Sequence, residues 1–183
     1  MTIEYKDSKR IVASGIGTEL SGVGGWKELG RITAGGSSTT MDVTGLADKR
    51  YLQFIVYSNL TSSNTINNTL NGITTNTYAE RHSIDGGSDV TTVSTANLNA
   101  SLGFSATPKF EVGYISNLDT KEKLALWWEA IQNTAGSGTA PRRIEFVSKH
   151  VQTTNPIDQF TTTSGSGNFP SGSEVVVLGW DPD

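Results

Sequence analysis

Short runs of β-branched and aromatic residues recur along this chain, and tracts of Ser, Thr, Asn and Gly separate each run from the next. Such runs are typical of β-strands, and Gly and Asn supply the turns between them. No repeat of 20–50 residues is present, which disfavours a propeller or a solenoid. The pattern predicts an all-β fold, an antiparallel β-sandwich of jelly-roll-like type. We expect its strands at 26–33, 40–46, 51–57, 69–73, 77–84, 110–115, 143–151, 157–162 and 174–180.

Two stretches carry more specific expectations. The segment 51–57 is almost wholly apolar, which predicts a central strand that is buried on both faces. Residues 88–107 are polar and poorly patterned, which predicts a long loop or an edge strand.

The segment 119–131 fits two structures. Asp119 and Glu122 have the spacing of a helical capping box, and apolar residues follow at helical intervals. Leu124, Leu126 and Trp128 also alternate as in a strand, and Gly136-Ser-Gly is a plausible hairpin tip. Because strands are expected on both sides, we favour the hairpin over the helix.

Composition limits the chemistry that the chain can perform. The 183 residues include no Cys, two His and 17% charged residues, so disulfides, thiolate catalysis and most zinc sites are excluded. The formal net charge is −4 and basic residues do not cluster, so we expect no nucleic-acid partner. No run approaches the roughly 20 apolar residues of a membrane span, and the N-terminus lacks the apolar stretch of a secretory signal.

No catalytic constellation can be recognised. His82 is near Ser83 and Asp85, but neighbouring residues of a strand point to opposite faces, so this is not a triad signature. The glycines near 15–25 lack the strand and helix that flank a dinucleotide-binding loop. We therefore expect a non-enzymatic protein without a cofactor.

An Asp-containing turn and a pair of adjacent Trp residues are the two features that are compatible with a binding function in addition to a structural one. Asp85 and Asp89 flank a Gly-rich turn and are candidate metal ligands, although Asp-Gly pairs favour turns for backbone reasons and the plain turn is the favoured interpretation. Trp127 and Trp128 face opposite sides if the segment is a strand. One of them could then contact a glycan or another subunit, whereas Trp residues in a small sandwich more often belong to the core or an interface.

The chain divides into an N-terminal arm and a body. Residues 1–25 combine a short strand candidate with a Gly-rich connector, and residues 26–183 are long enough for one sandwich domain. The arm is either a frayed terminus or an anchor that docks on a neighbour. As an anchor, its contact residues would be Ile3, Tyr5, Lys9, Arg10 and Ile11.

A series of phrases in the body resembles virion-associated structural proteins of environmental tailed phages and archaeal viruses. The phrases are Trp26-Lys-Glu-Leu-Gly-Arg, Gly45-Leu-Ala-Asp-Lys-Arg-Tyr-Leu52, Tyr78-Ala-Glu-Arg-His-Ser-Ile-Asp-Gly-Gly87, Gly113-Tyr-Ile-Ser-Asn, Thr120-Lys-Glu-Lys-Leu, Ala140-Pro-Arg-Arg-Ile-Glu-Phe-Val-Ser-Lys149 and Ser173-Glu-Val-Val-Val-Leu-Gly-Trp-Asp-Pro182. Residues 2–11 are similar to an N-terminal module that such viral proteins place before varied β-domains.

This resemblance implies a non-enzymatic β-sandwich located on the virion, as a capsid-decoration, tail-fibre or spike module. It implies capsid or tail proteins as partners and carries no catalytic residues. A homo-oligomer, with a trimer favoured, is the usual way in which such small domains gain stability and avidity. The alternative function is that of a receptor- or carbohydrate-binding module that contacts glycans on the host surface.

Overall fold

The computed structural model describes residues 3–6, 10–13, 25–60, 65–102 and 106–181, and every regular element among them is a β-strand. Two strands near the N-terminus, β1 (Ile3–Lys6) and β2 (Arg10–Ala13), form an antiparallel pair in which Tyr5 is opposite Ile11. The sequence predicted one short strand here. Lys9 and the connector 14–24 lie outside the described residues, so the anchor role of the arm stays a prediction.

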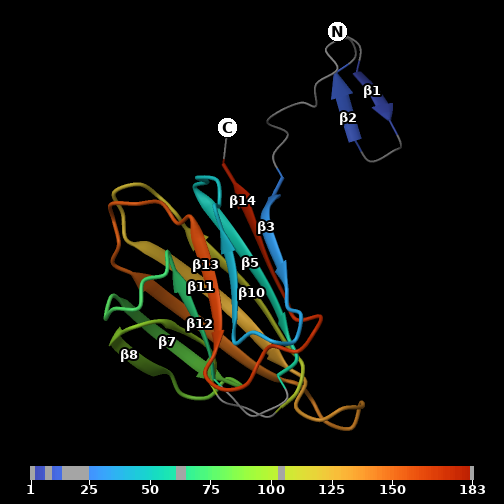
Figure 1. The fold of residues 1–183 in the computed structure, drawn as a ribbon, viewed down its shortest axis with the longest axis vertical. Helices are drawn as coiled ribbons and strands as arrows, with labels where there is room; N and C mark the ends of the chain where they lie inside the picture. The colour runs from blue at the N-terminus through green and yellow to red at the C-terminus, as the bar shows by residue number, and fades with distance from the viewer. Residues whose placement is uncertain (1–2, 7–9, 14–24, 61–64, 103–105, 182–183) are drawn as a thin grey trace.

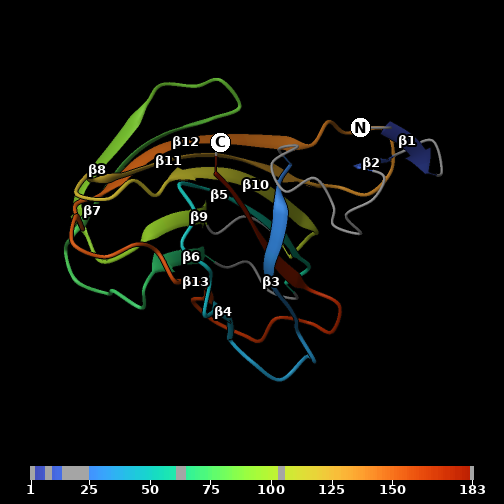
Figure 2. The ribbon, with the colours of Figure 1, turned by 90° about the horizontal axis from the view of Figure 1, so that it is seen from above.

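The remaining strands form two sheets that pack as layers, as Figure 2 shows. Both sheets are antiparallel throughout. The larger sheet has eight strands in the order β3 (Lys27–Thr33), β14 (Glu174–Trp180), β5 (Tyr51–Ser58), β10 (Lys109–Ser116), β11 (Lys123–Ile131), β12 (Arg142–His150), β7 (Tyr78–Ile84) and β8 (Val90–Thr95). The smaller sheet has the order β4 (Thr40–Thr44), β13 (Gln159–Ser164), β6 (Thr65–Leu70) and β9 (Leu98–Leu102). The antiparallel β-sandwich expected from the sequence is confirmed.

The core between the two sheets contains a row of packed aromatic side chains. Phe54 stacks on Phe160 of the smaller sheet with ring centroids 4.7 Å apart, and Trp127 stacks on Phe146 at the same distance. Gly113 pairs with Phe54 on one side and with Trp127 on the other. Its missing side chain leaves room for the two rings to approach each other at 6.2 Å.

The ambiguous segment is a strand, so the hairpin interpretation is confirmed and the helix is wrong. Each residue of β11 pairs with β10 on one side or β12 on the other, and most pair with both. These ladders satisfy the backbone groups that a helix would have satisfied internally, and the tertiary context therefore overrides the helical spacing.

Other expectations need correction or refinement. The strand β5 is central, between β14 and β10, but it is buried on one face only, because its outward side chains belong to an uncovered sheet face. The strand expected at 69–73 begins earlier, as β6. The stretch 88–107 provides β8 and β9, which are edge strands of the larger and the smaller sheet, and Figure 1 shows β8 at the rim of the sandwich.

Candidate interaction surface

The central strands bury charged residues on their inner face and expose apolar residues on their outer face. Along β11, Lys123 and Glu129 are each 1% exposed and point into the sandwich, whereas Leu124 and Leu126 are 59% and 40% exposed on the outer face. The neighbouring β10 repeats the pattern: Lys109 is buried and Phe110 is exposed. A solvated sheet face normally carries the polar residues of an alternating strand. This outer face is therefore unlike a surface made to contact water.

The exposed apolar side chains lie next to one another across four strands. Their register places Tyr57 opposite Phe110, Tyr114 opposite Leu126, and Leu126 opposite Val147. We define the outer-face patch as the seven large apolar residues of these strands that are at least one third exposed: Tyr57, Phe110, Tyr114, Leu124, Leu126, Trp128 and Val147.

A series of aromatic rings continues the patch toward β3 and β14. Tyr114 meets Trp128 edge-on with ring centroids 6.5 Å apart, and its other side meets Trp26 at 5.9 Å. Trp26 then meets Trp180 at 6.2 Å, and Trp180 stacks on Tyr51 at 5.5 Å. A shallow, mainly apolar groove of about 490 Å³ runs beside these rings and is lined by Trp26, Tyr51, Tyr114, Leu126, Val147 and Trp180, among others.

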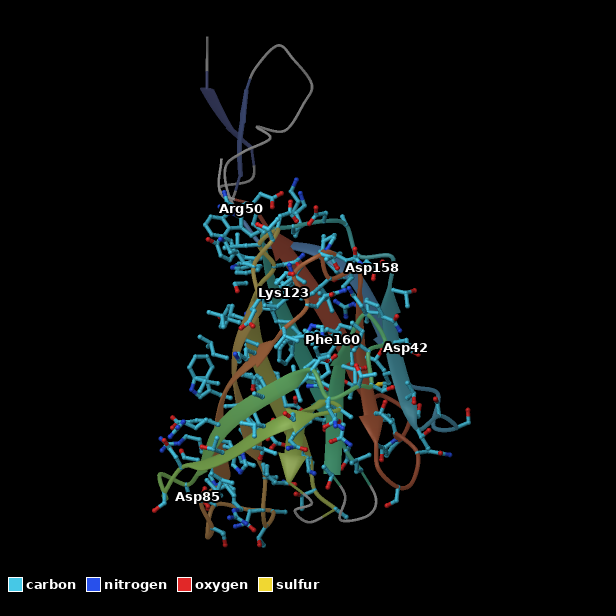
Figure 3. The ribbon with its side chains drawn as sticks, turned by 90° about the vertical axis from the view of Figure 1, so that its left-hand side faces the viewer. Asp42, Arg50, Asp85, Lys123, Asp158 and Phe160 are labelled. Atoms are coloured by element: carbon cyan, nitrogen blue, oxygen red, sulfur yellow. The ribbon has the colours of Figure 1, made fainter. Side chains whose placement is uncertain are left out.

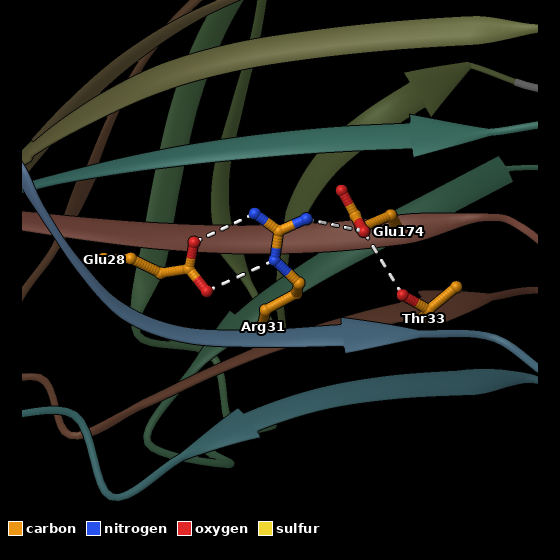
Figure 4. Close-up of polar contacts among 4 residues, drawn as sticks. All are labelled: Glu28, Arg31, Thr33 and Glu174. Atoms are coloured by element: carbon orange, nitrogen blue, oxygen red, sulfur yellow. Dashed lines mark hydrogen bonds and ion pairs between the residues drawn. The ribbon is translucent and has the colours of Figure 1, made fainter.

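Several ion pairs lie at the borders of this face. Arg31 binds both Glu28, at 2.9 Å, and Glu174, at 3.0 Å, and the Glu174 carboxylate also accepts a hydrogen bond from Thr33 (Figure 4). On the far side Arg81 pairs with Asp89, and Lys149 pairs with Glu122. Each of these charges thus has an opposite charge beside it.

The side chains of Trp127 and Trp128 point to opposite faces of the sheet, as the alternation of the strand predicted. Trp128 lies in the outer-face patch, 46% exposed. Trp127 as a glycan or subunit contact is wrong, because its side chain is 1% exposed and is stacked inside the core. The register with β10 and β12 decides which of the two indoles points inward.

The candidate metal ligands Asp85 and Asp89 are both engaged by arginine residues. Asp85 accepts hydrogen bonds from Arg142 Nε at 3.0 Å and from the Arg143 backbone at 2.8 Å, and these interactions lower the pKa of its carboxyl. Figure 3 shows Asp85 at the end of the sandwich opposite Arg50. Asp85 and Gly86 have positive φ angles of 52° and 77°, as expected of a turn. Within the part of the chain that the structure describes, no group of three His, Asp or Glu residues is arranged to hold a metal ion.

The two histidines are structural parts of the interior. His82 is 5% exposed, with Nδ1 placed 3.5 Å from Oε1 of Glu80, while the neighbouring Ser83 hydroxyl donates to Glu145 instead. His150 stacks on Tyr78 and makes a hydrogen bond of 3.1 Å to Thr77. Burial, followed by the nearby Lys123 ammonium, lowers the pKa of the His150 imidazole.

Sequence reasoning missed a buried polar cluster between the sheets. Glu111 is fully buried and lies opposite Glu129 in the ladder. One of its oxygens accepts a hydrogen bond of 3.4 Å from Asn68, and Thr162 donates to Asn68 in turn. Burial and the Glu129 carboxylate raise the pKa of Glu111 well above its ordinary value, and Lys109 opposes this shift. The alternation of β10 gave no signal, because Lys109 and Glu111 are residues normally expected on the solvated face.

This cluster predicts a measurable pH dependence for Glu111→Gln. The pKa of this carboxyl is higher in the folded chain than its ordinary value of 4.5 in the unfolded chain. It therefore contributes stability at pH values below 4.5, and this contribution is lost as the pH rises through the pKa of the folded state. The neutral amide does not ionise. We therefore expect the variant to gain stability over the natural chain as the pH rises from about 5 to about 8, by on the order of 1 kcal/mol.

Urea unfolding at several pH values tests this expectation. The exposed Glu122→Gln is the matched control, because Glu122 is a surface partner of Lys149 whose loss changes stability little at any of these pH values. A Glu111→Gln variant whose stability difference is flat with pH would show that Glu111 has an unshifted pKa.

No protein-family model matches the chain, and a search of curated proteins returns no match. Across the described ranges, no helix has the length and apolar character required to cross a membrane.

Proposed function

We propose that the protein is a non-enzymatic structural component of a virus particle, displayed as a capsid-decoration or fibre-type module. One observation carries the proposal, namely the order of the strands. We number eight of the strands, four from each sheet, one to eight along the chain: β3, β4, β5, β6, β9, β10, β13 and β14. In this numbering, the strand order is 1-8-3-6 in the larger sheet and 2-7-4-5 in the smaller sheet. These orders match those of a jelly roll, the eight-stranded double sheet that recurs in viral capsid proteins and lectins, and this match supports the proposal.

The additional strands support a display role. The hairpin β7–β8 is inserted between β6 and β9, and β11–β12 between β10 and β13. Both join the larger sheet beyond β10 and extend it from four strands to eight. The two hairpins therefore widen the outer face of the larger sheet, and this face carries the outer-face patch. A wide sheet face suits a protein whose task is contact with other particle components.

The N-terminal arm, residues 1–25, would provide the attachment. Its contact residues would be Ile3, Tyr5, Lys9, Arg10 and Ile11, which combine apolar and cationic side chains. The partners would be capsid or tail proteins, and the location would be the virion. An attaching arm in front of a β-sandwich body is also the organisation of the viral structural proteins that the sequence resembles, and such a role needs no catalytic residue.

A deletion of residues 1–25 tests the division between arm and body. We expect the truncated chain to keep the unfolding temperature of the full chain within about 2 °C, because the core residues among those that the structure describes all lie beyond residue 25. We expect it to be lost from particles that incorporate the full chain, as measured by immunoblot of purified particles. A truncated chain that is incorporated normally would contradict the anchor role.

Gold-labelled antibody against residues 26–183 tests the location itself. Label over particle heads supports a capsid decoration, and label at the tail supports a fibre. Intact virus particles whose genome encodes this chain but that carry no label would overturn the proposal.

One observation favours a second candidate function, the binding of neutral glycans on a host surface. The aromatic series from Tyr51 to Trp128 presents several rings along one groove, and aromatic rings with polar edges suit amphipathic ligands. A Trp128→Ala variant should then lose saturable binding to cells.

A further inference from the structure

The strands β10 and β11 combine buried charged residues with exposed apolar ones, and this is the strongest unexplained feature of the molecule. Lys109, Glu111, Lys123 and Glu129 occupy inward positions, although burial of charged groups is costly, while Leu124 and Trp128 occupy outward ones. Monomeric proteins rarely expose a contiguous apolar patch of more than a few hundred Å², and larger patches mark interaction sites. The outer-face patch is therefore a candidate interaction site.

We propose that the partner is a second copy of this chain, and that two copies pair through their outer-face patches about a twofold axis. The inference rests on the proposed function in one respect: the dimer would be the unit that the particle displays. An interface made from one patch meeting itself is isologous and closes at two subunits. A trimer would need two different complementary patches, so this inference replaces the trimer expected from the sequence with a dimer.

The area of the patch fits a dimer. Its seven side chains are between 37% and 59% exposed, and at roughly 150–250 Å² for a large side chain they present about 600 Å² of apolar surface. A stable interface buries about 800 Å² on each partner, with an apolar centre and a polar rim. The half-buried Ile55 and Val112, which lie between Tyr57 and Trp128 in the ladder, keep the patch continuous. The ion-paired residues around it would supply the rim.

The charges also fit a second copy. Lys149 has Glu122 at 3.1 Å, Arg81 has Asp89 at 3.1 Å, and Arg31 is held between two glutamates. Two such faces can therefore meet without strong repulsion between like charges. A polyanionic ligand would instead require cations not already engaged by carboxylates.

The composition of the patch favours a protein over a glycan. The two most exposed members are Leu124 at 59% and Val147 at 53%, and neither can hydrogen-bond a sugar hydroxyl. Leu126 and Val147 form the middle of the ladder between Tyr114 and Arg81. An apolar centre with charged side chains around it is typical of subunit contacts.

Sedimentation equilibrium of the full chain over a range of micromolar concentrations is the test. We expect a species of twice 19.5 kDa that dissociates on dilution. Leu126→Glu places a charge at the centre of both patches, and we expect it to weaken pairing at least 100-fold and leave a 19.5 kDa monomer. The matched control is Val93→Glu, because Val93 is 66% exposed on the edge strand β8, outside the patch, and this variant should dimerise normally.

Circular dichroism of the Leu126→Glu variant checks that it folds. Trp128→Arg is a second patch variant at an exposed position, and its sedimentation is measured in parallel. A natural chain that stays monomeric at every concentration would overturn the inference. So would a dimer or trimer that both patch variants leave intact, or equal weakening by Val93→Glu. A monomer that binds a neutral polysaccharide through Trp128 would assign the face to a glycan instead. Failure of the proposed function is a separate result, since particles without label can coexist with a dimer in solution.

Discussion

Replacement of Trp127 by alanine is expected to lower the free energy of unfolding by about 3–5 kcal/mol, among the largest losses that a single substitution in this fold can cause. The indole is 1% exposed and stacks on Phe146 at 4.7 Å, with Phe54 on its other side at 6.2 Å. Alanine would leave a cavity in the middle of this aromatic row. At roughly 2–4 °C per kcal/mol, Tm should fall by about 6–20 °C, as measured by calorimetry, and urea unfolding measures the loss of free energy.

Two further variants make this prediction specific. Trp127→Phe should lose less than about 1.5 kcal/mol, because it keeps the stacking and removes an indole N–H that has no hydrogen-bond partner among the described residues. Trp128→Ala, one residue along the strand, should change the stability of the dilute chain by less than about 1 kcal/mol. Equal losses for Trp127→Ala and Trp128→Ala would mean that the register of β11 is wrong.

Replacement of Gly113 by alanine is expected to cost about 3 kcal/mol, although it adds one methyl group. The added Cβ would overlap ring atoms of Phe54 and would lie 2.6 Å from the Cβ of Trp127. Neither neighbour can move freely, since Phe54 is stacked on Phe160 and Trp127 on Phe146. Equilibrium unfolding in urea measures the loss.

Gly138→Ala is the control for this substitution, because an added Cβ at Gly138 would meet no atom within 4 Å. Its stability should differ from that of the natural chain by less than about 0.5 kcal/mol. Phe54→Leu should partly restore the Gly113→Ala variant, since it removes the ring that the methyl group meets. Tolerance of Gly113→Ala without any loss would contradict the close packing of this row.

The positions of the strands could be predicted because alternation is a local signal. Glu174–Trp180 and Lys109–Ser116 alternate or run apolar within a few residues, and the structure contains both strands. The helical spacing within Lys123–Ile131 was a competing local signal, and the flanking strands decided between the two. The double burial expected for 51–57 was wrong because an apolar strand can face an interaction surface as well as a core.

The candidate surface could be predicted in part. The sequence placed Trp127 and Trp128 on opposite faces, but it could not assign the faces, because both sides of β11 carry apolar residues. The ring series joins Trp26 and Trp180 from opposite ends of the chain with Tyr114 from its middle. No local pattern predicts such a grouping. The pairing of Glu111 with Glu129 depends in the same way on the register between two strands.

The position of β14 has a consequence for how the chain acquires its fold. This strand follows all the others in sequence, yet it lies between β3 and β5, with Gly179 paired to Lys27 and Val177 paired to Phe54. Until residues 174–180 leave the ribosome, β3 lacks its partner in the larger sheet and one side of β5 stays open. Pairings of such large sequence separation slow folding, and unpaired edges are prone to aggregation. Formation of the larger sheet therefore includes a late insertion step, in which β14 enters between β3 and β5.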